Sequence, residues 1–135
     1  MRTVIAGASA LSLAAVAAAV GLVGSDVAAQ AAARPRAKVS VTIKAEQVDL
    51  SGTVSSARPV KCAANRTVWV WEQIGSRGGG DDEKRYSDTT DLQDGKYVWD
   101  TGNTGEEGFF YAVVAPKPGC RGASSPTVHA VRSDD

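Results

Sequence analysis

The 135-residue chain contains few of the side chains on which enzymes and metal proteins depend: one histidine and two cysteines. It also lacks net charge, because Lys+Arg and Asp+Glu both number 15. A chain with formal charge zero gives no electrostatic reason to bind nucleic acid or an anionic membrane surface. We therefore expect neither nucleic acid nor an anionic membrane surface as a partner.

Catalytic patterns are missing as well. The one histidine, His129, lies in "TVHAV", where strand alternation predicts an ordinary surface position. No G-x-S-x-G nucleophile elbow occurs. Glu106 and Glu107 are adjacent on a glycine-rich loop, and nothing in the sequence holds two carboxylates on opposite sides of a bond. We expect no enzyme activity and no cofactor.

Two loops could be mistaken for ligand sites. The glycines at 78–80 are followed by Asp81, Asp82 and Glu83 rather than by the Lys-Ser/Thr and helix of a phosphate-binding loop. The carboxylates at 88, 91 and 94 are three positions apart, whereas a calcium loop spaces its ligands by two and ends with Glu. The sequence therefore predicts no metal site, and a solvated acidic loop at 78–83 that is too mobile to anchor a ligand.

The N-terminal segment has the composition of a secretory signal. Arg2 is followed by an uncharged run from residue 4 to residue 23, and then by small residues suitable for cleavage. We expect cleavage after Ala31, with Ala29 and Ala33 as alternatives. An uncleaved membrane anchor is the other interpretation, although a run so rich in Ala and Gly is weakly hydrophobic.

This interpretation divides the chain into three parts. Residues 1–31 form the signal peptide, residues 32–38 a flexible basic lead-in, and residues 39–135 one small domain. The product is expected outside the cell, with no membrane attachment after cleavage. Cysteines are oxidised there, and Cys62 and Cys120 can pair in only one way, so we expect a structural disulfide between them.

The domain reads as strands throughout. Apolar residues alternate with polar ones, turn residues separate the runs, and no window repeats apolar residues at helical spacing. The pattern predicts an all-β sandwich of seven strands. These lie at 38–44, 48–54, 66–74, 83–90, 96–100, 108–114 and 125–132, the fourth being polar and edge-like.

The order of residues along the domain resembles the small secreted Ig-like or prealbumin-like sandwich domains of actinobacteria. The segment "TDLQDGKY" is also similar to transthyretin-like and carboxypeptidase-regulatory modules. The resemblance implies a Greek-key sandwich without enzyme activity, and the sequence departs from it at Trp69 and Val113. It rests on Gly52, Val54, Cys62, Arg66, Val68, Thr89, Thr90, Asp91, Gly95, Tyr97, Tyr111, Ala112, Cys120, Ser125 and Val128.

Strand alternation then divides the aromatic residues between two faces. The family pattern places the valines at 68 and 70 inward, together with Phe110, Ala112 and Val114 on a neighbouring strand. Tyr97 and Trp99 are expected in the core. The remaining side chains of these two strands form an outward apolar face, and a contiguous apolar surface usually marks an interaction site. It consists of Trp69, Trp71, Phe109, Tyr111 and Val113.

Two functional hypotheses follow. The first is a secreted, non-catalytic binding module whose aromatic face engages a protein partner, a second copy of itself or a glycan. Aromatic rings suit the flat faces of sugars, but the sequence does not locate the polar groups that such a site usually adds. The second is a structural or inert secreted domain whose face is covered by the N-terminal segment or stacked on itself.

Overall fold

The computed structural model describes residues 35–133. The predicted signal peptide, its cleavage site and the first three residues of the lead-in lie outside the described residues. The described part is a sandwich of two antiparallel β-sheets, so the predicted all-β class is confirmed. The elements are β1 (Val39–Val41), β2 (Lys44–Glu46), β3 (Asp49–Ser56), α2 (Pro59–Cys62), β4 (Thr67–Glu72), β5 (Glu83–Thr89), β6 (Asp91–Gln93), β7 (Lys96–Asn103), β8 (Gly108–Val114), β9 (Ala123–Ser124) and β10 (Val128–Ala130).

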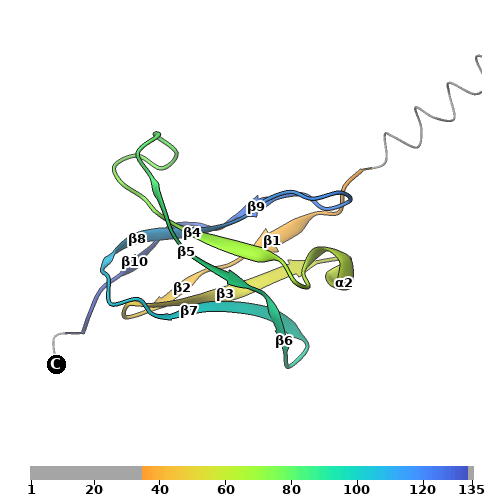
Figure 1. Cartoon of the computed structure of the whole chain (residues 1–135), viewed down its shortest axis with the longest axis horizontal. Helices are drawn as coiled ribbons and strands as arrows, with labels where there is room; N and C mark the ends of the chain where they lie inside the picture. Colours follow the sequence, from red (N-terminus) through yellow and green to blue (C-terminus); the bar gives the residue numbers. More distant parts are fainter. Residues whose placement is uncertain (1–34, 134–135) are drawn as a thin grey trace, which may run out of the picture. The chain divides into compact units, whose positions relative to one another are not determined.

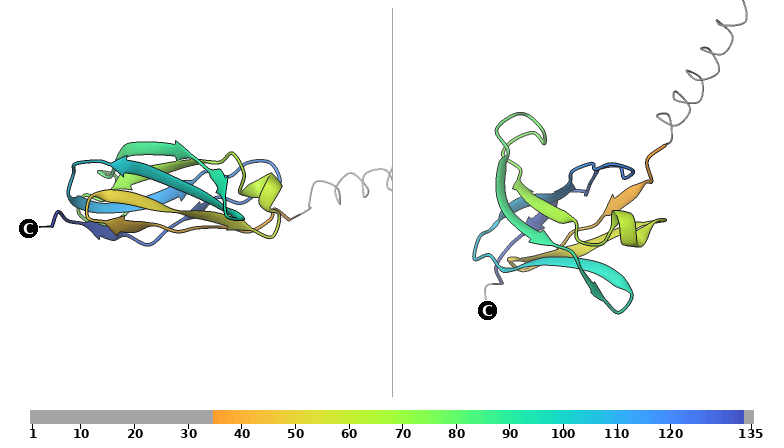
Figure 2. Two further views of the ribbon diagram at one scale, coloured as in Figure 1. Left: turned by 90° about the horizontal axis from the view of Figure 1, so that it is seen from below. Right: turned by 45° about the vertical axis from the view of Figure 1, so that its right-hand side comes forward.

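The first sheet has the order β1-β3-β7-β6, with β2 also paired to β3. The second has the order β10-β8-β4-β5, with β9 also paired to β8, so β5 is the edge strand that its polar sequence indicates (Figure 1). The loop between β4 and β5 and the β6–β7 hairpin lie at opposite ends of the domain (Figure 2). Strands β4 and β8 are neighbours, as the sandwich hypothesis requires.

The strand count differs from the predicted seven. The predicted strand 38–44 is interrupted after Val41, so it forms two short strands, β1 and β2, that pair with the same edge of β3 in one continuous register. A Cβ atom at Gly52 would lie 1.9 Å from the carbonyl oxygen of Thr42, so only glycine permits the backbone of the edge segment to approach this closely. The short strands β6 and β9 add to the count, since runs of three and two residues are too short for a period to be read.

The core has the predicted facing. Val68 and Val70 of β4 are fully buried, and Trp99 of β7 is 1% exposed. Tyr97 is half-buried and packs against the same core. The inward residues of β8 complete the contact between the sheets: Phe110, Ala112 and Val114.

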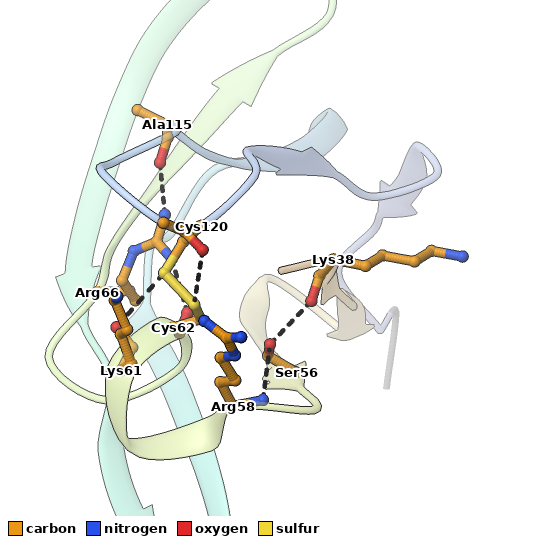
Figure 3. The surroundings of a disulfide bond; sticks show 9 residues. Lys38, Ser56, Arg58, Lys61, Cys62, Arg66, Ala115 and Cys120 are labelled. Atoms are coloured by element: carbon orange, nitrogen blue, oxygen red, sulfur yellow. Dashed lines mark hydrogen bonds between the residues drawn. A yellow bond between two sulfur atoms is a disulfide. The ribbon is translucent and has the colours of Figure 1, made fainter. Parts of the chain in front are cut away.

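One end of the sandwich is closed by the predicted disulfide. Cys62 at the end of α2 is bonded to Cys120, which is 58 positions away in the chain (Figure 3). The buried guanidinium of Arg66 donates to the carbonyl oxygens of Cys62 (2.6 Å) and Ala115 (2.5 Å). Burial lowers the pKa of this guanidinium, and the two carbonyls supply the hydrogen bonds that water would otherwise make. Arg66 is thus a structural residue that links α2 to the end of β8.

The lead-in is joined to the same end. The Ala37 amide donates to Gly119, and the Arg121 amide donates to Ala37. The β6–β7 hairpin lies at the α2 end as well (Figure 1) and turns at Asp94 and Gly95, whose φ angles are 52° and 80°. These are the positive angles that the Asp-Gly pair predicts for a tight hairpin.

Candidate binding face

The outer face of the second sheet brings together four of the five aromatic and apolar residues that the sequence singles out. In the β4–β8 register, Trp69 is opposite Val113 and Trp71 is opposite Tyr111. Residues directly opposite each other in antiparallel strands point to the same side of the sheet. The two positions at which the sequence departs from the family pattern, Trp69 and Val113, are therefore cross-strand neighbours.

Phe109 lies apart from this group. It is 50% exposed, and its register partner is His129 on β10. The phenyl and imidazole rings are stacked with centroids 4.2 Å apart and planes 8° apart. His129 is exposed, as expected, but its stacking on Phe109 was not predicted, because the pairing of β8 with β10 depends on the fold.

The β4–β5 loop (residues 73–82) is tied to this face by Asp82. Its carboxylate accepts hydrogen bonds from the Tyr111 hydroxyl (2.6 Å) and from the amides of Gly78 (2.9 Å) and Ile74 (3.0 Å). The bond from Tyr111 and then the two amides hold the pKa of Asp82 below its usual value. Burial first, and then the Asp82 carboxylate, raise the pKa of Tyr111. Three hydrogen bonds to one carboxylate anchor a loop that its composition predicts to be mobile.

Arg77 covers the other side of Tyr111. Its guanidinium lies 4.1 Å from the centre of the Tyr111 ring and donates to the Thr127 hydroxyl at 3.3 Å. Thr127 in turn donates to the Gln73 side chain at 2.7 Å. Tyr111 is only 7% exposed as a result, so it supports the loop more than it presents a ring to solvent.

The tryptophans are covered less completely. Both are half-buried, and the ammonium of Lys84 on the edge strand lies 4.2 Å from the Trp69 ring centre and 5.3 Å from that of Trp71. Lys84 is opposite Trp71 in the β4–β5 register. A lysine ammonium at this distance is attracted to the ring face by about 0.5–1 kcal/mol at an exposed site. The two indoles and Lys84 thus form one unit on the sheet surface.

A groove of about 440 Å³ runs between the sheet and the loop. One wall is apolar and comes from β4 and β8, and the other comes from glycines and a carboxylate of the loop. Its lining residues are Trp71, Gly78, Gly80, Asp82, Tyr111 and Val113.

The other carboxylates that the sequence analysis considered as ligands or catalytic groups lie away from this face. Asp88 accepts from the Asp100 amide at 2.9 Å, and Asp94 sits in the hairpin turn. Glu106 pairs with Arg85 at 2.5 Å, and this bond lowers the pKa of Glu106. Glu107 accepts from the Arg132 amide at 3.3 Å. Within residues 35–133, no group of three or more His, Cys, Asp or Glu side chains is placed to hold a metal ion.

No protein-family model and no curated protein matches this chain. The two-sheet antiparallel sandwich is compatible with an Ig-like domain, which is as far as the resemblance is supported. In the part of the chain that the structure describes, no helix is long and apolar enough to cross a membrane.

Sequence reasoning missed Arg77 and Lys84 as residues of the face, and it assigned Asp82 only to a mobile acidic loop. The signal for Asp82 is an aspartate among glycines just before a strand, because short carboxylate side chains often accept backbone amides in loops. Lys84 requires the strand register, which the sequence alone does not provide.

Proposed function

We propose that this protein is a non-catalytic binding module whose contact surface is the outer face of β4 and β8. The observation that carries the proposal is the pair of half-buried indoles, Trp69 and Trp71, beside a groove that an anchored loop borders. Large rigid rings give up little side-chain entropy on contact, and binding energy concentrates in such anchors. Partners of three kinds suit the face: a protein, a second copy or a glycan.

We also propose that the domain is secreted and that its sandwich belongs to a particular subclass. A disulfide between Cys62 and Cys120 is in keeping with secretion after removal of residues 1–31. A Greek-key arrangement of the Ig-like or prealbumin-like kind is the finer fold that we propose for the sandwich.

A structural role is the second candidate, and one observation favours it. Lys84, Arg77 and Asp82 cover much of the aromatic face with contacts from the chain itself. Covering of this kind could complete a stable but inert domain, because the rings already have partners.

The test is the double variant Trp69→Ala, Trp71→Ala, first checked for a native circular dichroism spectrum. We expect it to lose self-association by light scattering, or retention on cell-wall material, relative to the parent protein. Leu92→Ala is the matched control, because Leu92 is an exposed apolar residue of β6 in the other sheet. Equal behaviour of the parent and the double variant in both assays would favour the structural role.

A further inference from the structure

The polar groups around the indoles indicate the kind of partner, and this inference rests on the proposed binding function. One row of residues crosses the sheet through four strands in register: Ser87, Trp69, Val113 and Ser124. Both serines are exposed. The row thus places an indole and a valine between two hydroxyl groups, which is an apolar platform with hydrogen-bonding groups at its margins.

The second row adds charge. It runs from Lys84 through Trp71 to Tyr111, whose hydroxyl is bonded to Asp82. One oxygen of Asp82 accepts two hydrogen bonds, whereas Oδ1 accepts one, from Ile74, and keeps capacity for another donor. The groove therefore combines an indole, a carboxylate acceptor and an ammonium.

Lys84 lacks an anionic partner. The salt bridges among residues 35–133 involve Lys44 and Arg85, and none involves Lys84. Its ammonium lies over the two indole faces. An anion brought beside these rings would form a charge-assisted hydrogen bond with Lys84, which is stronger than a neutral one.

Other classes of partner fit less well. An extended peptide binds by adding a strand to a sheet edge, whereas β4 and β8 are paired on both sides. Nucleic acid requires several cations along its backbone, and the chain has no net charge. A sugar ring has a flat C–H face for an indole and hydroxyls for the serines and Asp82.

We propose that the face binds an acidic glycan, a chain of sugar rings that carries carboxylates. One ring enters the groove against Trp71, where a hydroxyl reaches the free lone pair of Asp82, and the next ring lies toward Trp69 and Ser87. Lys84 swings off the indole faces and binds a carboxylate of the chain. The glycines at 78 and 80 leave room beside the ring, since a Cβ atom at either position would meet nothing within 4 Å.

The experiment is a titration of the full chain, followed by tryptophan fluorescence, with three soluble probes. The probes are oligogalacturonates, glucuronate-containing hyaluronan oligomers and neutral cello-oligomers. We expect at least one uronate probe to bind more tightly than the neutral one, and to weaken when its carboxylates are methyl-esterified or when salt is raised.

Variants of Lys84 then test whether its ammonium binds the carboxylate. Lys84→Gln should weaken uronate binding about five- to tenfold, as expected for loss of one charge-assisted contact. Lys84→Arg should keep most of the affinity. Lys96→Gln, which removes an exposed lysine from the other sheet, should have no effect.

Three outcomes would overturn the inference. These are equal affinity for uronate and neutral probes, unchanged binding by Lys84→Gln, or no binding of any probe. If no probe binds while the double tryptophan variant still loses self-association or cell-wall retention, only the acidic-glycan inference fails. If that variant also behaves as the parent does, the proposed function fails with it.

Discussion

Trp69 and Val70 are consecutive residues of β4 with opposite surroundings. Val70 is fully buried between the sheets, whereas Trp69 lies on the outer face under the side chain of Lys84. Removing a buried side chain leaves a cavity, but removing an outer one leaves space that water can fill. The contrast separates residues that hold the fold from residues available for contact.

We expect Val70→Ala to lower the free energy of unfolding by about 2 kcal/mol, the range for a buried aliphatic side chain. Trp69→Ala should lower it by about 1 kcal/mol or less, because the indole lies on the solvent side. Urea unfolding of both variants would measure the difference. A loss from Trp69→Ala equal to or larger than that from Val70→Ala would mean that the indole mainly supports the fold.

Asp82 gives the face a dependence on pH. Its hydrogen bonds lower its pKa in the folded state, so their stabilisation is present above the unfolded pKa of about 3.9 and lost as the pH falls through the lower folded pKa. We therefore expect the loop 73–82 to detach from Tyr111 below about pH 4. The ring signals of Tyr111, followed by NMR as the pH is lowered, would record it.

The matched variants for this titration are Asp82→Asn and Asp81→Asn. Asp82→Asn removes the ionisable group, so the acid transition of the Tyr111 signals should disappear. Asp81 is its exposed neighbour in the same loop, and its replacement should leave the transition unchanged. A transition that persists in Asp82→Asn would assign it to another carboxylate, such as Glu106.

Among the elements, the passage from β1 to β2 is the least regular. Both strands pair with β3, and Thr42 between them donates from its amide to Thr53 while its carbonyl lies over Gly52. The register with β3 is the same before and after Thr42, so β1 and β2 form one edge segment with a local distortion. The distortion depends on the missing side chain at Gly52, where the Trp99 indole nitrogen would also be 2.9 Å from an added Cβ.

Gly52→Ala should therefore destabilise the domain by about 3 kcal/mol or more, because the backbone of Thr42 has to move. Thermal unfolding would measure the effect. Ser51→Ala, a change of similar size at the adjacent half-buried position, is the control and should be close to neutral. A Gly52→Ala protein as stable as the parent would show that the Thr42 backbone can move away at no cost in stability.

At the scale of the whole molecule, the disulfide joins α2 to the loop after β8 and so closes most of the domain into one covalent ring. The Arg66 guanidinium spans the same region through two carbonyl oxygens, which persist when a cysteine side chain is changed. The bridge itself acts mainly by restricting the unfolded chain.

We expect the pair Cys62→Ser, Cys120→Ser to lower stability by roughly 4 kcal/mol, the chain-entropy value for a loop of this length. Chemical denaturation of the parent and the double variant would measure this loss of stability.

The denatured parent should release no thiol to a thiol reagent unless a reductant is present. Two reactive thiols in untreated protein would contradict the disulfide.

The resemblance supplied which residues of β4 and β8 face inward. The sequence by itself determined the strand class, the disulfide and the Asp94-Gly95 turn. These depend on local rules: side chains alternate along a strand, and two cysteines allow one pairing. It also identified the indole pair, because alternation assigns Trp69 and Trp71 to one face whatever the neighbouring strands are.

Only the tertiary structure decided what surrounds that pair. The close approach of Thr42 to Gly52, the stacking of Phe109 on His129 and the positions of Asp82 and Lys84 depend on which strands are neighbours and in what register. Register follows from packing across the whole sheet, and a slip of one residue would turn every side chain to the other face. No local pattern carries that information, so the polar groups beside the indoles became visible only when the two sheets were assembled.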